Sequence, residues 1–212
     1  MLFRSPHSRV DVRDLDSDFI AFSGHKMLGP AGTGVLSGKA EALERLNPII
    51  VGGGAVERVT DAGYDLKVLP YRLEAGTPNV GGVLGLAAAV EYLQALGGEA
   101  ILAHEALLAA VLSRELEGLP HMRVAHSLGG QRLAVAALIP TADWLLPDDL
   151  AGALSDQHGI VTRSGFHCAH PLLDSLDAPH GALRLSAYVY NSPEELRDAC
   201  RALRGVLEAF GR

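Results

Sequence analysis

One stretch near the start of the chain constrains the fold most: Phe19-Ile-Ala-Phe-Ser-Gly-His-Lys26, followed by Met-Leu-Gly-Pro-Ala-Gly-Thr-Gly34. β-forming residues run unbroken from Phe19 to Ser23, which predicts a short buried strand. The glycine-rich segment after Lys26 predicts a return into a second strand. At the end of a core strand, Lys26 would be partly desolvated, which favours a nucleophilic amine able to form a Schiff base. Taken alone, the pattern also fits a solvated turn lysine.

A second stretch, Arg163-Ser-Gly-Phe-His-Cys-Ala-His-Pro171, holds one of the two cysteines of the chain. Cys168 lies among glycine, histidine and proline, which predicts a loop rather than a packed helix face. A reactive thiol needs a nearby cation, which Arg163 and His167 could supply. A lone cysteine is otherwise an inert buried residue, and Cys200 in the last predicted helix is assigned that role. Three candidate ligands within four residues cannot easily form a tetrahedral site, so no metal is expected.

A third stretch, Arg72-Leu-Glu-Ala-Gly-Thr-Pro-Asn79, precedes a predicted helix. Together the three stretches resemble the cysteine desulfurases, which are enzymes of the class V aminotransferase family that depend on pyridoxal 5′-phosphate (PLP), and more closely the SUF-system type. In that family Ser-Gly-His-Lys carries the PLP lysine, and Arg-x-Gly-x-His-Cys-Ala carries the sulfur-accepting cysteine. The resemblance runs from about Val10 to the C-terminus and covers the second half of the family's usual chain.

The interleaved helices and strands predict an α/β or α+β fold. The resemblance implies fold type I of the PLP-dependent transferases. Residues 1–96 would be the C-terminal part of the large PLP-binding domain, and residues 97–212 the complete small α+β domain with the cysteine loop. Gly97-Gly98 would mark the boundary.

The resemblance also assigns the cofactor site. Lys26 would hold PLP and then act as the general base at the substrate Cα. Ser23 and His25 would bind the PLP phosphate, and Gly76 and Thr77 would reach the phosphate of the partner protomer across a dimer interface. From the residues alone, Thr77 fits a helix N-cap and His25 fits a turn histidine bonded to backbone.

The resemblance implies L-cysteine as the substrate and assigns Arg184 and Arg163 to bind it. Arg184 lies within a predicted strand, where a charged side chain is expected to have a partner or a ligand. A guanidinium binds a carboxylate through two hydrogen bonds. A structural ion pair is the alternative for Arg184. Two departures from the family stand out: Phe166 replaces the first histidine of the usual His-His-Cys, and the aspartate that binds the PLP ring belongs to the half not covered.

The expected function is therefore cysteine desulfurase, which converts L-cysteine to L-alanine and leaves a persulfide on Cys168. The sulfur would pass to an acceptor protein for iron–sulfur cluster assembly. A homodimer is expected, with the N-terminal half supplied as a separate chain or lost by truncation. The sequence leaves open whether Met1 is the true start. Two alternatives remain open: a selenocysteine lyase or other class V C–S lyase, and a non-catalytic fragment for dimerisation or acceptor docking.

Composition agrees with a soluble globular protein. Of 212 residues, 48% are hydrophobic and 20% charged, with a net charge of −7 and no basic run, so nucleic acid is an unexpected partner. Two cysteines suit a reducing cytosol. The apolar stretch Val80 to Val90 is broken by Glu91 and is too short to span a bilayer. With no apolar signal segment at the N-terminus, a cytoplasmic location is expected.

The other elements follow from local patterns. A helix at 81–96 that is apolar on nearly all faces is expected to be buried, whereas residues 52–70 read as an irregular loop. In the helix at 99–116, Leu102, Leu107, Val111 and Leu112 are expected to face a core. Ser192, Pro193 and Glu195 predict a capped start for the last helix. The remaining predictions are helices at 39–45 and 148–158, strands at 122–126, 133–139, 160–162 and 183–190, and a turn at 128–131.

Overall fold

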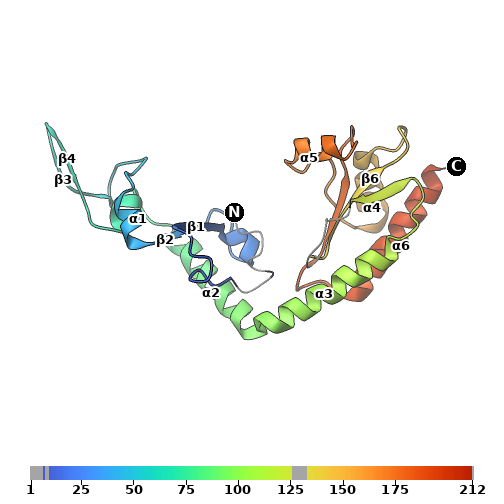
Figure 1. The fold of residues 1–212 in the computed structure, drawn as a ribbon, viewed down its shortest axis with the longest axis horizontal. Helices are drawn as coiled ribbons and strands as arrows, with labels where there is room; N and C mark the ends of the chain where they lie inside the picture. The colour runs from blue at the N-terminus through green and yellow to red at the C-terminus, as the bar shows by residue number, and fades with distance from the viewer. Residues whose placement is uncertain (1–6, 8–9, 126–132, 212) are drawn as a thin grey trace. The chain divides into compact units, whose positions relative to one another are not determined.

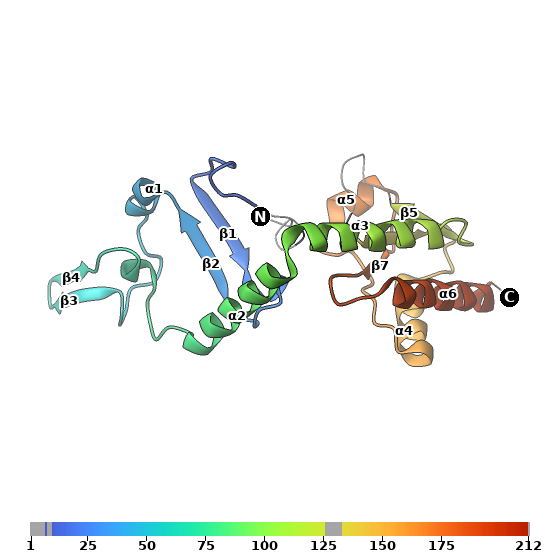
Figure 2. The same ribbon diagram turned by 90° about the horizontal axis from the view of Figure 1, so that it is seen from below.

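The computed structural model describes residue 7, residues 10–125 and residues 133–211. The turn predicted at 128–131 lies outside the described residues. Contacts divide the chain into two units, Met1–Gly98 and Glu99–Arg212, whose elements are labelled in Figures 1 and 2. Within the described part no single helix is long and apolar enough to cross a membrane. The helices on either side of Gly97 meet that test only when they are taken together.

Unit 1 is organised around the predicted hairpin. Strand β1 (Phe19–Ser23) pairs antiparallel with β2 (Gly34–Gly38), so that Phe19 lies opposite Gly38 and Ser23 opposite Gly34. The prediction that β1 is buried is wrong, because Ile20 is its one buried residue and Phe19 is 40% exposed. The physical reason is that β1 and β2 form a two-stranded sheet with no further strand beside them among the described residues.

A 3₁₀ turn, η1 (Gly24–Met27), follows β1 and packs against helix α2 (Val80–Leu96). Glycines allow this close approach. A Cβ added at Gly24 would lie 2.3 Å from Thr33 Oγ1, and one at Gly82 of α2 would lie 2.4 Å from Thr33 Cγ2. Two ordinary side chains at these positions would push the hairpin away from α2. The packing therefore holds in place the turn that carries Lys26.

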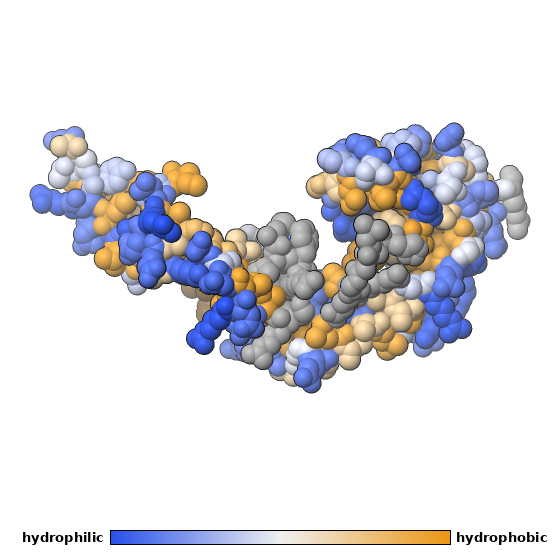
Figure 3. Space-filling view, in the orientation of Figure 1, coloured by the Kyte–Doolittle hydropathy of each residue, from blue (hydrophilic) through white to orange (hydrophobic). Residues whose placement is uncertain are grey.

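Helix α2 forms as predicted, but its surroundings differ from the prediction. Its N-cap is Asn79, whose Oδ1 accepts a hydrogen bond from Gly82 N at 3.0 Å, so the alternative of a Thr77 cap is wrong. The expectation of a buried helix is also wrong: Val83 and Leu84 are more than half exposed. The hairpin covers one face, and the buried positions of α2 are Gly82, Leu86, Ala89 and Leu93. Figure 3, in which apolar residues are orange, accordingly shows apolar side chains at the surface of the molecule.

The region 52–70, predicted to be irregular, contains a second hairpin formed by β3 (Val56–Thr60) and β4 (Gly63–Leu66). Its residues are mostly exposed on both faces. An alternating apolar pattern is therefore missing, which explains why the sequence did not reveal these strands. Unit 1 also contains the predicted short helix, α1 (Ala40–Glu44), and a 3₁₀ turn, η2 (Tyr71–Leu73).

Unit 2 is a three-stranded antiparallel sheet of order β5-β6-β7 with helices on both faces. Alternate residues of β6 enter two separate cores: Ala136 and Leu138 pack with the long helices, whereas Ala137 and Ile139 pack with the short α5. The cysteine loop precedes α5 and lies on this second face. The strands are β5 (Met122–Ala125), β6 (Val135–Pro140) and β7 (Leu183–Ser186), and the helices are α3 (Gly98–Glu115), α4 (Pro147–His158), α5 (His170–Ser175) and α6 (Pro193–Phe210).

Most predicted elements of unit 2 are present, with three corrections. The strand expected at 160–162 reduces to one isolated bridge, between Arg163 and Arg184. The strand expected at 183–190 ends at residue 186, where the chain turns toward α6. In α3, Val111 and Leu112 are buried as predicted, but Leu107 is half exposed, since its neighbour at 108 occupies the core position.

The predicted capped start of α6 is confirmed. Ser192 Oγ accepts from Glu195 N at 3.1 Å, Glu195 Oε2 accepts from Ser192 N at 2.6 Å, and Pro193 occupies the first turn. These reciprocal bonds satisfy backbone donors that the helix leaves unpaired. They fix the point at which the chain returns from β7 to the helical layer.

Candidate functional site

The Lys26 turn gathers three candidate residues on one short segment. Ser23 is the residue before η1 and makes no side-chain bond that caps it, while His25 and Lys26 lie within the turn. Ser23 is half-buried, and His25 and Lys26 are exposed. The expected partial desolvation of Lys26 is therefore wrong, because the thin hairpin leaves the turn open to solvent on one side.

Gly76 and Thr77 lie in the segment that leads into α2, ahead of its N-cap Asn79. Gly76 has φ +93°, a conformation that favours glycine, and its N–H donates to Gly53 O at 2.7 Å. Thr77 is exposed, and Asn79 rather than Thr77 caps the helix. The Thr77 hydroxyl is thus not engaged as a cap.

The Cys168 segment of unit 2 is a tight turn. Ala169 N donates to Phe166 O at 2.8 Å, and the two central residues, His167 and Cys168, have φ of 53° and 58°. Positive φ at both central positions is the mark of a mirror-image, type I′ turn. Cys168 is exposed at its tip, so its thiol is open to another molecule.

A guanidinium lies beside this thiol. Arg163 Nη2 is 3.8 Å from Cys168 Sγ, within hydrogen-bonding distance for sulfur. The Arg163 backbone is fixed by two bonds with Arg184: Arg163 N donates to Arg184 O at 3.1 Å, and Arg184 N donates to Arg163 O at 2.7 Å. A cation at this distance stabilises a negatively charged sulfur.

The surroundings of His167 disfavour a second positive charge beside Arg163. Its Nε2 lies 3.0 Å from Ala182 O. Burial, and then the charges of Arg184 and Arg163, lower the pKa of His167 below its ordinary value, although the bond to Ala182 acts in the opposite direction. A lowered pKa favours the neutral ring, so the structure does not support the expectation that His167 contributes to the positive field.

Arg184 is half-buried in β7 and has no acidic partner in the described part of the chain. Its Nε is buried without a hydrogen-bond partner. Burial first, and then the charge of Arg163, lower the pKa of Arg184. The alternative of a structural ion pair is thus not observed among the described residues. A guanidinium held without an anion is suited to bind a carboxylate from outside.

Cys200 differs from Cys168 in its exposure and in its surroundings. It is 2% exposed within α6, and burial raises the pKa of its thiol to about 11. It packs among the leucines of the main core of unit 2. This is the environment of an inert structural cysteine.

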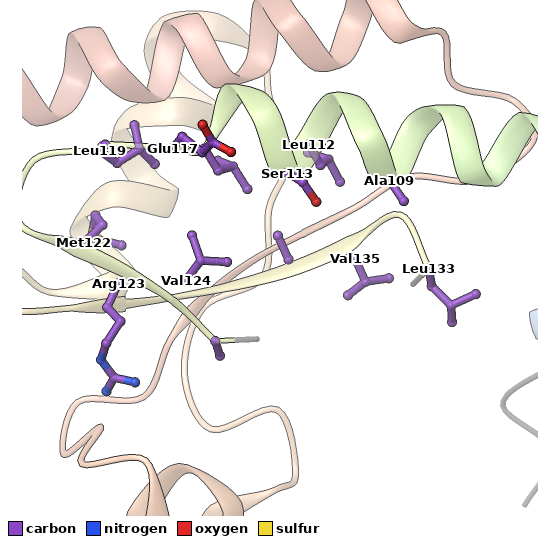
Figure 4. Close-up of a pocket in the computed structure, with 14 residues that line it drawn as sticks. Ala109, Leu112, Ser113, Glu117, Leu119, Met122, Arg123, Val124, Leu133 and Val135 are labelled. Atoms are coloured by element: carbon purple, nitrogen blue, oxygen red, sulfur yellow. The ribbon is translucent and has the colours of Figure 1, made fainter. Parts of the chain in front are cut away.

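An apolar cavity lies away from these residues. It has a volume of about 890 Å³ between α3 and strands β5 and β6, and its lining is mainly apolar. Figure 4 shows the side chains that line it, among them Leu112 of α3 and Val124 of β5. A second cavity of about 820 Å³ lies by the loop that follows α5. None of the candidate residues lines either cavity, and no group of three metal-ligating side chains is placed to hold an ion among the described residues.

PLP, which the resemblance implies, requires an amine for its aldehyde and donors for its phosphate. Lys26 supplies an amine, and Ser23 and His25 supply a hydroxyl and an imidazole on the same turn. Ser23 does not use its side chain to cap η1, and the turn is open to solvent. This donor set fits the aldehyde and phosphate of PLP.

Comparisons with known proteins agree with these features. The family model for class V aminotransferases matches residues 4–198. The chain is 42% identical over 202 residues to a probable cysteine desulfurase of Vibrio cholerae, covering 95% of this chain and 48% of that protein. It is 40% identical over 207 residues to one of Halalkalibacterium halodurans, covering 98% and 50%. The chain thus spans about half the length of the curated relatives it matches.

Two solved structures are similar along nearly the whole chain. The apo cysteine desulfurase of Thermococcus onnurineus NA1 has a TM-score of 0.88 at 36% identity, covering 97% of this chain and 50% of that one. The cysteine desulfurase CsdA of Escherichia coli, in an S-sulfonic acid form, has a TM-score of 0.84 at 36% identity, covering 98% and 49%. The described elements therefore follow the fold of these enzymes over about half of their length.

Proposed function

Because this chain belongs to the class V aminotransferase family, we propose that it is the lysine- and cysteine-bearing half of a PLP-dependent cysteine desulfurase. L-cysteine and the thiol of Cys168 would give L-alanine and a persulfide on Cys168. The substrate Cβ–S bond breaks, an S–S bond forms to Cys168 Sγ, and Cβ takes up a proton. The transferred sulfur is oxidised as Cβ is reduced, so the step needs no other redox partner.

One observation carries the proposal: the exposed Cys168 thiol lies 3.8 Å from the Arg163 guanidinium. A sulfur nucleophile must be accessible and must be stabilised as the thiolate. The tight turn gives access, and Arg163 supplies the charge. Cys200, buried with a raised thiol pKa, has neither property.

The substrate carboxylate is assigned to Arg184. Its guanidinium has no acidic partner among the described residues, and the reciprocal backbone bonds with Arg163 fix its strand beside the cysteine turn. A bidentate contact there would orient the amino acid so that its sulfur points to Cys168.

On the other unit, Lys26 would carry PLP and would move the proton at the substrate Cα once its amine is released. When bound, PLP supplies an electron sink for the bonds at Cα. Ser23 and His25 would hold the phosphate. The Gly76-Thr77 pair is assigned to the phosphate of a second protomer, which makes a homodimer part of the proposal.

The proposal extends to the setting of the reaction. Residues 1–96 would be part of a large PLP-binding domain, and residues 97–212 a small domain. The remaining half of the relatives' length would take part on the same or on a separate chain. A sulfur-acceptor protein would regenerate the Cys168 thiol and deliver sulfur for iron–sulfur cluster assembly. A cytoplasmic location is proposed because a thiol that must be restored in each cycle suits a reducing compartment.

Product analysis tests the proposal. The chain, combined with the remaining half, is incubated with PLP and L-cysteine, and both alanine and one added sulfur atom on the peptide containing Cys168 are measured. Both products should disappear in Lys26→Ala, and the sulfur adduct and most of the alanine in Cys168→Ser. Alanine formed equally by Cys168→Ser would contradict sulfur transfer to Cys168. L-selenocysteine is run in parallel, and a lyase would cleave it in the absence of Cys168.

A further inference from the structure

The turn that presents Cys168 is costly for the residues it contains. His167 and Cys168 both have φ between 53° and 58°, a region that glycine and asparagine enter most easily. A mirror-image turn with two residues of other types needs support from its surroundings. The contacts of the turn should therefore show which group holds it.

Two kinds of contact support the turn. Before it, the backbone of Gly165 pairs with Ala182 in both directions, at 3.1 and 3.0 Å. The ring of His167 then reaches the same carbonyl, with Nε2 3.0 Å from Ala182 O. The rings of Phe166 and His170 stack across the turn at 4.5 Å, nearly parallel. His167 is thus the turn residue whose side chain ties it to the segment leading into β7.

The chemistry of this contact assigns the tautomer of His167. A carbonyl oxygen accepts only, so Nε2 must carry the proton and donate it. The other nitrogen, Nδ1, is buried without a partner among the described residues. The charged groups that face the ring are Arg163 and Arg184, and both oppose a second proton.

We propose that His167 is a positioning residue for Cys168: it donates Nε2–H to Ala182 O and so holds the 166–169 turn with the thiol beside the Arg163 guanidinium. The inference rests on the proposed function, in which Cys168 accepts sulfur. Without this hydrogen bond, the turn would relax toward more favourable backbone conformations. The thiol would then spend less time near the guanidinium.

The rate of alkylation of Cys168 by iodoacetamide at neutral pH measures this positioning without cofactor or substrate. In the whole chain, His167→Ala should slow the reaction about fivefold. This is the factor by which losing one net hydrogen bond would lower the population of the turn that holds the thiol beside Arg163. His167→Gln should stay within about twofold of the wild type, because its side-chain amide can donate at nearly the position of Nε2. His158→Ala, at an exposed helix end, is the matched control, and the buried Cys200 is the internal reference.

Equal or faster alkylation of His167→Ala would overturn the inference, and so would a His167→Gln variant as slow as His167→Ala. Circular dichroism shows whether each variant is folded. A second measurement needs no variant: NMR of ¹⁵N-labelled histidine should find His167 neutral with the proton on Nε2, and a proton on Nδ1 would refute the assignment. Failure of the chain to form alanine would instead count against the proposed function, since neither test uses PLP or cysteine.

Discussion

Replacing Arg184 with methionine distinguishes an arginine that binds a ligand from one that supports the fold. Arg184 is half-buried, its Nε has no hydrogen-bond partner, and Arg163 lies close enough to lower its pKa. Methionine keeps an unbranched side chain that packs in the same space and removes the charge. The fold should therefore become more stable when this arginine is lost.

The structure sets the magnitude and supplies a control. A buried polar group without a partner costs about 1–3 kcal/mol, and partial exposure places Arg184 at the lower end, about 1 kcal/mol. Arg204 is the opposite case, because it donates to the carbonyls of Gly118, Glu115 and Glu117 at 3.4, 3.3 and 3.2 Å. Arg204→Met should therefore lower the free energy of unfolding by about 1 kcal/mol. With a urea slope of about 2–3 kcal/mol/M, the two midpoints should move about 0.4 M in opposite directions.

Urea unfolding followed by fluorescence measures both variants. Trp144 is the only tryptophan of the chain and lies in unit 2. Its ring meets that of His121 edge-on at 5.3 Å, so its emission reports the unit that holds both arginines. If Arg184→Met lowers the midpoint as much as Arg204→Met does, Arg184 is a structural residue and its assignment to the substrate carboxylate fails.

Three further outcomes follow from α6 and its cysteine. Ser192→Ala should lower the free energy of unfolding in urea by about 1 kcal/mol. The control Ser155→Ala, at an exposed position of α4, should change it by less than about 0.5 kcal/mol. Equal effects of the two substitutions would contradict a capping role for Ser192. The bonds from the Ser192 backbone and side chain lower the pKa of Glu195. This contribution is therefore present above the ordinary value of 4.5 and is lost as the pH falls through the lower folded value. The free-energy cost of Glu195→Ala, which removes the carboxylate that accepts from Ser192 N, should accordingly shrink in acid, and a constant cost would contradict the reciprocal bond. Iodoacetamide should modify Cys200 only in urea, and modification in the folded chain at the rate of Cys168 would contradict its burial.

Local signals in the sequence were sufficient where a feature is encoded by neighbouring residues. The capped start of α6 depends on three residues within four positions, and the β1–β2 hairpin on a short run of β-formers followed by glycines. Cys168 was predicted to lie in a loop from its glycine, histidine and proline neighbours. In each case the deciding contacts are separated by few positions in the chain.

Burial could not be predicted in the same way. The apolar faces of α2 predicted a buried helix, but burial depends on what packs against each face, and the hairpin covers only one. The partial desolvation expected for Lys26 failed for the same reason. The tether of His167 joins it to Ala182, fifteen residues later, and no local pattern indicates a bond between a ring and a distant carbonyl. The β3–β4 hairpin was missed because its exposed strands lack apolar alternation.

The central claim is that this chain holds PLP through Lys26 for use with Cys168. The most direct test is the visible absorbance spectrum of the purified chain with added PLP, beside Lys26→Ala and the control Lys39→Ala, whose amine pairs with Asp16 at 2.7 Å. The account predicts a protein-bound absorbance band in the wild type and in Lys39→Ala that is absent in Lys26→Ala. A band of equal strength in Lys26→Ala, or no band in the wild type, would contradict it.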